Sequence, residues 1–212
     1  MSVDLRCYLV TSGTGAHTVQ VAARAAAAGA GTVQVRAKDA STAQLFELTC
    51  AVAEAVAGAG TGTRVLVNDR VDVALAAQRA GAAVHGVHLG QDDLPVAAAR
   101  DLLGPEAIIG QTTGTLELVR RAEQDRELLD YIGAGPFRRT PTKDSGREPL
   151  GVRGYRDLVA ATGLPIVAIG DIRPEDAPAL AGTGVAGVAL VRALMGAEEP
   201  ESVVREVLAA FS

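Results

Sequence analysis

"RVLVNDRVDVALAAQRAG", residues 64–81, contains the two patterns that decide the fold. Its first part, residues 65–67, is apolar and β-branched, which is typical of a strand buried on both faces. This run ends in the polar pair Asn68 and Asp69, and the segment that follows is rich in alanine and has the length of a helix. We therefore interpret the stretch as one strand–helix unit, the repeating element of α/β proteins.

The same unit recurs along the whole chain. Eight short runs are each followed by a segment of helical length: LRCYLVT (5–11), TVQVRA (32–37), RVLVND (64–69), GVHLG (86–90), AIIGQTT (107–113), YIGAG (131–135), PIVAIG (165–170) and GVALV (187–191). Eight such units favour parallel strands closed into a (β/α)8 barrel, the TIM barrel, over an open doubly wound sheet. No linker or low-complexity tract divides the chain, so we expect one barrel domain over residues 1–212.

Composition narrows the class of protein. The chain has 212 residues, 48% of them hydrophobic, and a net charge of −5 with dispersed basic residues, which argues against binding to nucleic acid or to an anionic membrane surface. Cys7 and Cys50 are too few for a disulfide framework and lack metal-ligand spacing. No targeting segment opens the sequence, and no run approaches the roughly 18 apolar residues of a membrane span. We expect a cytoplasmic protein.

Polar residues that interrupt the apolar pattern gather where strands are expected to end, which is the face of a TIM barrel that carries the active site. In residues 32–38 the alternation places Gln34, Arg36 and Lys38 on one face of a strand. Two cations on an enclosed face require an anion as partner. An anionic ligand is therefore expected at this end of the barrel.

Asp69 and Asp93 follow neighbouring strands and predict a shared Mg²⁺, an ion that typically takes one or two protein carboxylates together with waters and substrate phosphates. The alternative is that each aspartate caps a helix. His88 is interpreted as a hydrogen-bonded histidine of the barrel interior, because the sequence offers no nucleophile for it to activate.

Two further segments suggest phosphate binding. The stretch 133–151 has no periodicity, and its residues 136–150 predict a binding loop. The alternative is a solvated loop without a ligand. The ends of the seventh and eighth runs, with Gly170 and a short helix expected at RALMG (192–196), fit the phosphate site that barrels often carry there.

The motifs YLVT, VQVRAKD, VNDRVDVAL, GVHLGQDDLP, IIGQTT, DYIGAGP, TPTK, PIVAIGDI and GVALVRAL occur in this order along nearly the whole chain. Together they resemble the thiamine-phosphate synthase family. The resemblance implies a Mg²⁺-dependent transferase that joins hydroxymethylpyrimidine diphosphate to hydroxyethylthiazole phosphate, giving thiamine phosphate and releasing pyrophosphate. It implies small-molecule substrates as partners and leaves open whether the chain forms a homo-oligomer.

The resemblance also implies roles for individual residues. The pyrimidine diphosphate would be bound by Gln34, Arg36, Lys38, Asn68 and Thr112, and Mg²⁺ by Asp69 and Asp93. The loop residues Thr140, Thr142 and Lys143 would hold the thiazole and the diphosphate, and Gly170, Asp171, Val191 and Arg192 the thiazole phosphate. Catalysis, as stabilisation of the leaving diphosphate, would fall to Arg36, Lys38, Lys143 and Thr112.

The chain departs from the family pattern at Asp171, where a second glycine is usual. A carboxylate beside a phosphate would repel it by roughly 4 kcal/mol at 4 Å and an effective dielectric of 20, so Asp171 must turn away, cap a helix or weaken binding. Two other functions stay open at this point: a thiazole tautomerase-like isomerase, and a non-catalytic barrel that binds phosphorylated ligands.

Overall fold

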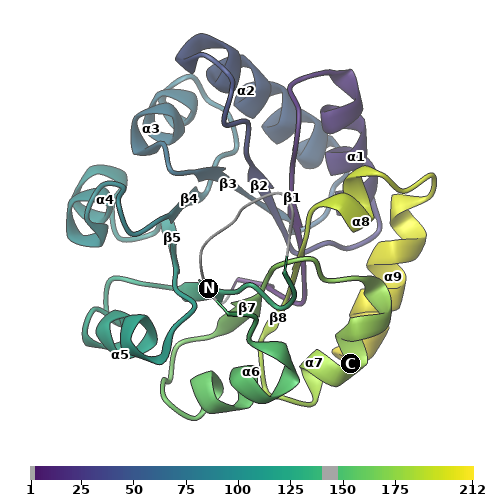
Figure 1. Ribbon diagram of the computed structural model, residues 1–212. Coiled ribbons are helices and arrows are strands. Elements are labelled where there is room, and N and C mark those ends of the chain that lie inside the picture. The colour runs from purple at the N-terminus through teal and green to yellow at the C-terminus, as the bar shows by residue number, and fades with distance from the viewer. Residues whose placement is uncertain (1–2, 140–147) are drawn as a thin grey trace.

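The computed structural model describes residues 3–139 and 148–212, and its strands form a closed parallel barrel in chain order (Figure 1). The strands are β1 Cys7–Val10, β2 Thr32–Val35, β3 Arg64–Asn68, β4 Gly86–Leu89, β5 Ile108–Thr112, β6 Tyr131–Ala134, β7 Ile166–Ala168 and β8 Gly187–Leu190. The barrel closes where Leu9 of β1 lies opposite Leu190 of β8. The predicted TIM barrel is therefore confirmed, and each of the expected runs contains one strand.

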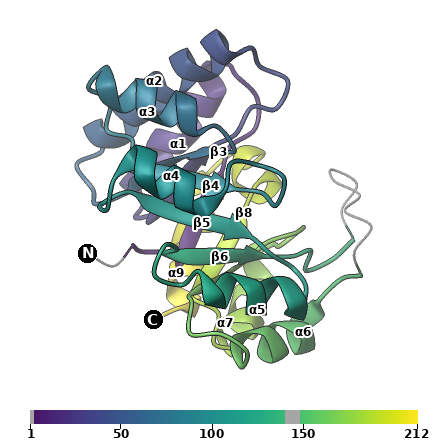
Figure 2. The same ribbon diagram turned by 90° about the vertical axis from the view of Figure 1, so that its left-hand side faces the viewer.

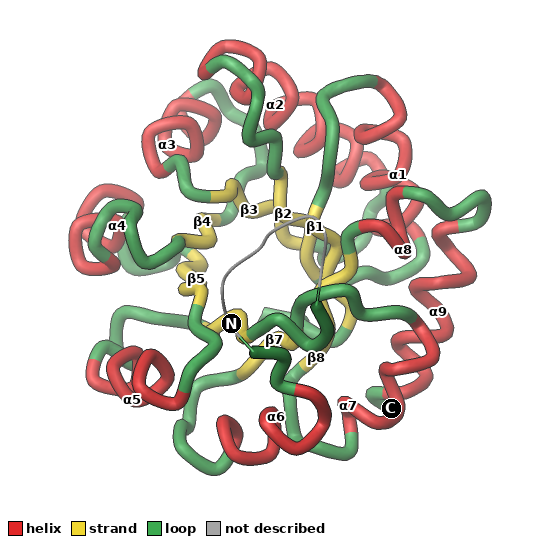
Figure 3. The backbone as a smooth tube through the Cα atoms, viewed as in Figure 1, coloured by secondary structure: helices red, strands yellow, loops and turns green. Residues whose placement is uncertain are grey.

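Helices surround the barrel on its outside (Figure 3). They are α1 Ala16–Ala27, α2 Thr42–Gly58, α3 Val71–Arg79, α4 Val96–Leu103, α5 Leu116–Gln124, α6 Gly151–Val159, α7 Ala177–Ala181 preceded by the 3-10 turn η1 Pro174–Asp176, α8 Arg192–Met195 and α9 Pro200–Ala210. The short helix expected at RALMG is α8. None of the helices in the described part of the chain is both long and apolar enough to cross a bilayer.

The apolar residues form two separate cores, because successive side chains of a strand point to opposite faces. In β3, Val65 and Val67 pack outward against the helical layer, whereas Leu66 points into the barrel. The inner core consists of Leu5, Tyr8, Val10, Leu66, Tyr131, Val167 and Ala189. The barrel is consequently filled with side chains, as in other TIM barrels.

The two ends of the barrel differ (Figure 2). The N-terminal segment lies at the end where the strands begin, and the chain that leaves β6 lies at the other end. There Gly170, in the left-handed region with φ of 113°, approaches the loop after β6 so closely that a Cβ would lie 2.5 Å from Cα of Pro136. The loops after β6 and β7 thus depend on a glycine for their close contact.

One boundary differs from the prediction. The alternation in residues 32–38 predicts a strand that includes Arg36 and Lys38, but β2 ends at Val35. Lys38 lies in a turn in which the amide of Ala40 donates to the carbonyl of Ala37. Arg36 and Lys38 therefore belong to the loop beyond the strand, and only Gln34 of the three is a strand residue pointing into the barrel.

Candidate active site

The end of β2 brings one amide and two cations to the C-terminal end of the barrel. Gln34 is buried, and its Nε2 donates to the hydroxyl of Tyr8 at 2.8 Å. Arg36 is half-buried and its amide donates to Oγ1 of Thr11 at 3.0 Å, which ties the ends of β1 and β2 together. Lys38 is exposed, and among the described residues neither Lys38 nor Arg36 forms an ion pair with a carboxylate. Their charges remain available for an anionic ligand.

Asp69 and Asp93 lie side by side after β3 and β4. The pKa of the Asp69 carboxyl is raised, first by burial and then by the hydrogen-bonding contact with Asp93 and its negative charge. The charge of Lys38 and a hydrogen bond from Asn68 act in the opposite direction without cancelling the rise. A divalent cation bound between these two carboxyl groups would relieve their repulsion, so the pair is a candidate cation site.

The backbone holds Asp69 in an unusual conformation. Its φ of 64° lies in the left-handed region, and its amide donates to the carbonyl of His88 at 2.8 Å. Asp93 is fixed through its own Oδ2, which accepts from the amide of Gly90 at 2.6 Å. Left-handed non-glycine residues are uncommon and gather at functional sites.

The donor set fits Mg²⁺ better than a metal that needs a full protein cage. Within residues 3–139 and 148–212 no group of three or more histidine, cysteine or acidic side chains is arranged to hold a metal. Two carboxylates suffice for Mg²⁺ when waters and substrate phosphates complete its coordination. Asp69 and Asp93 are the residues that would hold it.

His88 and Thr112 lie inside the barrel near the C-terminal ends of β4 and β5. Nδ1 of His88 lies 2.9 Å from the hydroxyl of Tyr131, and its Nε2 lies 2.9 Å from Oγ1 of Thr112. The hydroxyl of Tyr131 in turn lies 2.7 Å from that of Tyr8. The prediction of a hydrogen-bonded interior histidine is confirmed, whereas the two tyrosines were not identified from the sequence.

The ends of β7 and β8 are joined by an ion pair. Arg192, the first residue of α8, donates from Nη2 to Oδ1 of Asp171 at 2.5 Å. Asp171 has a φ of 53°, and its backbone carbonyl accepts from Nη1 of Arg138 at 3.1 Å. Of the three outcomes considered for Asp171, helix capping is not the one observed, because its carboxylate is paired with the guanidinium of Arg192.

Arg138 and Asp176 form a second clamp that sequence reasoning missed. The guanidinium of Arg138 donates to both carboxylate oxygens of Asp176, a 9% exposed residue, and lies over the ring of Phe137. The run "FRR", residues 137–139, supplies both the ring and the guanidinium of this clamp. Its partner 38 residues away could not be identified without the fold.

The predicted site residues divide into three groups. At or next to the C-terminal ends of β2 to β5 the structure places Gln34, Arg36, Lys38, Asn68, Asp69, Asp93 and Thr112. After β7 and β8 it places Gly170, Asp171, Val191 and Arg192. Thr140, Thr142 and Lys143 lie outside the described residues.

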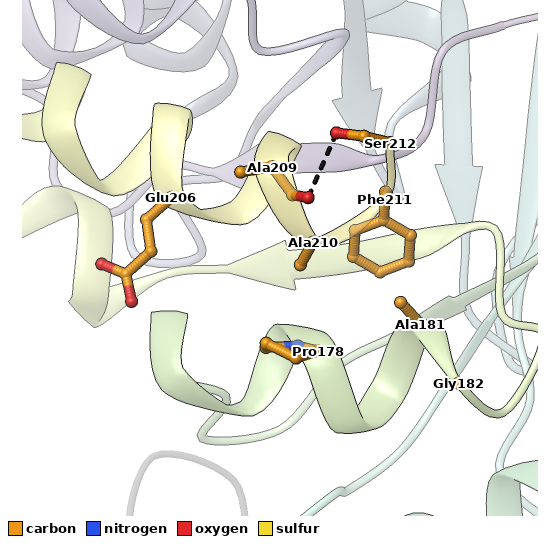
Figure 4. Close-up of a pocket in the computed structure, with 8 residues that line it drawn as sticks. All are labelled: Pro178, Ala181, Gly182, Glu206, Ala209, Ala210, Phe211 and Ser212. Carbon is orange, nitrogen blue, oxygen red and sulfur yellow. Dashed lines mark hydrogen bonds between the residues drawn. The ribbon is translucent and has the colours of Figure 1, made fainter.

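A pocket also occurs on the outer surface, between α7 and α9 (Figure 4). Its lining is mostly small or apolar, including Pro178, Ala181 and Phe211, with Glu206 at one side. It belongs to the helical layer and contains none of the predicted site residues. The strand ends remain the candidate active site.

Comparisons with known proteins identify the family. A family model described as thiamine monophosphate synthase matches residues 7–194. The thiamine-phosphate synthases of Corynebacterium efficiens and Corynebacterium jeikeium are 60% and 58% identical over 209 and 211 residues, which is 98% and 100% of this chain and 95% and 96% of theirs. The solved thiamine phosphate pyrophosphorylase from Pyrococcus furiosus superposes with a TM-score of 0.83 at 30% identity, covering 99% of this chain and 96% of that one. The chain therefore belongs to the thiamine monophosphate synthase family of transferases.

Proposed function

We propose that this transferase condenses hydroxymethylpyrimidine diphosphate with hydroxyethylthiazole phosphate in a Mg²⁺-dependent substitution that gives thiamine phosphate and pyrophosphate. The observation that carries the proposal is the pairing of Asp69 with Asp93 beside Lys38 at the strand ends. Carboxylates next to an available lysine suit a diphosphate with its magnesium better than they suit either ion alone.

The chemistry asks the chain to stabilise charge and to position two substrates. The bond between the pyrimidine methylene and the diphosphate oxygen breaks, and its electron pair leaves with the diphosphate. The methylene cation is stabilised by its electron-rich ring, and the thiazole nitrogen donates the pair that forms the new carbon–nitrogen bond. Bound Mg²⁺ would supply positive charge to the departing diphosphate.

Arg36 and Lys38 have the residue types and position to face the negative charge that grows on the leaving group. Neither forms an ion pair with an acidic side chain of the described ranges, so their charges can act on the diphosphate. Thr112 would add a hydroxyl donor. Lys143, Thr140 and Thr142 stay in the proposal as ligands from the loop after β6, on the strength of the TPTK motif.

No covalent enzyme intermediate is needed, in agreement with a site that offers charges and hydrogen-bond donors. Asn68 and Gln34 would orient the pyrimidine, and Arg192 would meet the thiazole phosphate at the end of β8. Val191 and Gly170 would contribute backbone at the same place.

The test is to incubate the purified protein with both phosphorylated substrates and Mg²⁺ and to measure thiamine phosphate and pyrophosphate. The two products should appear in equal amounts and only with the metal. Isomerisation of the thiazole without condensation would instead favour a tautomerase-like enzyme. Ligand binding without any turnover would favour a non-catalytic barrel.

A matched variant makes the metal assignment testable. Asp69→Asn preserves the shape of the side chain and tolerates the left-handed backbone, so it changes charge with little strain. Turnover should fall by about 100-fold or more, and the concentration of Mg²⁺ for half-maximal rate should rise. Near-normal kinetics would refute the role of Asp69.

A further inference from the structure

Five side chains form one continuous row of hydrogen bonds through the barrel. Nε2 of Gln34 lies 2.8 Å from the hydroxyl of Tyr8, which lies 2.7 Å from the hydroxyl of Tyr131. The row continues over 2.9 Å to Nδ1 of His88, and over 2.9 Å from its Nε2 to Oγ1 of Thr112. The row starts on β2, passes through β1, β6 and β4, and ends on β5.

The direction of every bond in this row follows from its first member. An amide nitrogen only donates, so the oxygen of Tyr8 accepts from Gln34. Tyr8 and Tyr131 are 1% and 0% exposed, and a buried hydroxyl proton without an acceptor is costly. Tyr8 therefore donates to Tyr131, and Tyr131 donates to Nδ1 of His88.

The ring of His88 extends the same donor-to-acceptor direction to Thr112 at the end of β5. A neutral imidazole that accepts at Nδ1 carries its proton on Nε2, and this proton is donated to Oγ1 of Thr112. With its oxygen accepting from His88, Thr112 keeps its own hydroxyl proton for donation to another acceptor. At the other end, the side-chain oxygen of Gln34 accepts no hydrogen bond from any described residue.

The sequence makes room for the row with glycines. A Cβ at Gly110 would lie 2.1 Å from Cζ of Tyr131 and 2.5 Å from its hydroxyl. A Cβ at Gly133 would lie 3.0 Å from Cε1 of His88. Burial raises the pKa of both tyrosine phenols above the ordinary value, so both keep the proton that the row requires.

We propose that His88 is a positioning residue that carries the polarity set at Gln34 through to Thr112, so that the Gln34 oxygen as an acceptor and the Thr112 hydroxyl as a donor are presented at the same barrel mouth. An acceptor suits an amino group on a nitrogen heterocycle, and a donor suits a phosphate oxygen. The inference rests on the proposed function for the identity of these ligands. The polarity itself rests on the row alone.

The first experiment observes the protonated nitrogen of His88 in the free protein by ¹⁵N nuclear magnetic resonance. The chain has three histidines, and His85 provides an internal reference because its Nδ1 accepts from the amide of Val65 at 3.1 Å. His88 should match His85 as the Nε2–H form. A proton on Nδ1 would mean that the row runs in the opposite direction, and would overturn the proposal.

The second experiment separates the two nitrogens by substitution. The amide of glutamine can replace Nε2 of histidine, and that of asparagine can replace Nδ1. His88→Gln should retain the donor to Thr112 and keep kcat/KM for the pyrimidine diphosphate within about threefold of wild type. His88→Asn should retain only the contact with Tyr131 and lose about tenfold, as should Thr112→Val.

A double mutant completes the test. The combination of His88→Asn with Thr112→Val should reduce kcat/KM by no more than Thr112→Val alone, because His88 acts through Thr112. Thr112→Ser, which keeps the hydroxyl, should recover the kcat/KM that Thr112→Val loses. Equal losses in His88→Gln and His88→Asn, or additive losses in the double mutant, would overturn the positioning role. A protein that forms no thiamine phosphate but has its proton on Nε2 of His88 would refute the proposed function and support the polarity.

Discussion

Arg192 neutralises Asp171 across the ends of two strands, with Nη2 of the arginine 2.5 Å from Oδ1 of the aspartate. The carboxylate that departs from the family pattern thus has a partner that starts the next short helix, α8. A phosphate bound at this end of the barrel would compete with Asp171 for the same guanidinium. The pair would therefore set how much positive charge such a phosphate meets.

Asp171→Asn should lower the KM for the thiazole phosphate several-fold, because it releases Arg192 and suits the left-handed backbone at φ 53°. Arg192→Ala should raise this KM by about tenfold, since the carboxylate is then unpaired next to the phosphate. The measurement is the initial rate at varied thiazole phosphate with saturating pyrimidine diphosphate. Unchanged values in both variants would place the phosphate elsewhere.

Asp93→Asn should stabilise the metal-free protein at pH 7–8. The pKa of Asp69 is raised by burial and by Asp93, so its contribution to stability is present at acidic pH and is lost as pH rises through the folded-state value. Asp93→Asn removes the like charge and so relieves this loss. We expect the free energy of unfolding to rise by about 1 kcal/mol, which corresponds to about 2–4 °C in Tm for a chain of this size.

Thermal unfolding with a chelator, from pH 3.5 to 8, measures this effect. The gap between Asp93→Asn and wild type should close near pH 4, where carboxyl groups of the unfolded chain become protonated. Added Mg²⁺ should raise the Tm of the wild type more than that of the variant. A variant less stable than wild type at pH 8 would contradict the repulsion.

Arg138→Ala should destabilise the fold by roughly 1–2 kcal/mol at neutral pH, because it leaves the carboxylate of Asp176 nearly buried and without its guanidinium. Burial acts to raise the pKa of Asp176, but the hydrogen bonds from Arg138 and from the amide of Arg173 outweigh it and lower the pKa. The stabilisation is thus present above about pH 4 and is lost as pH falls through the lowered value. Urea unfolding should therefore show a large difference in the free energy of unfolding between Arg138→Ala and the wild type at pH 7, and a small difference at pH 3.

Arg138→Lys is the control for charge alone. It should recover only part of the lost stability, since lysine cannot donate to both oxygens in parallel as the guanidinium does. Full recovery would show that the geometry of the clamp is unimportant.

Gly110→Ala should destabilise the protein by about 1–3 kcal/mol or more, because its Cβ would overlap the ring of Tyr131 at 2.1 Å. Gly58→Ala is the matched control, since a Cβ at the end of α2 meets no atom of the described chain within 4 Å. That change should be neutral or slightly stabilising. Equal Tm values for the two variants would mean that the inner core is looser than these contacts require.

The sequence predicted the parts of the protein that depend on local patterns. Strand runs and helical segments follow from periodicity within one element, so the barrel and the short helix α8 were correctly predicted, and Asp69 and Asp93 were expected together because their strands are neighbours. The strand boundary at Val35 was missed because a turn at Lys38 interrupts an alternation that continues in the sequence.

Contacts between distant segments could not be predicted in the same way. Tyr8 and Tyr131 are 123 residues apart, and each by itself is an ordinary aromatic residue in a strand. Their meeting depends on which residues of β1 and β6 share a layer of the barrel interior. The partnership of Asp171 with Arg192 likewise depends on how two loops are placed, although each residue was noticed as a departure or a candidate.

The filled interior has a consequence for how ligands enter and leave the barrel. Leu5, Tyr8 and Tyr131 fill the space inside the barrel. A compound that binds at the C-terminal ends of the strands therefore binds and dissociates at that end, and does not pass through the barrel. If the two substrates of the proposed reaction both enter from this side, the one that binds deeper has to bind first and dissociate last. Inhibition patterns with each product would therefore reveal a fixed order of exchange.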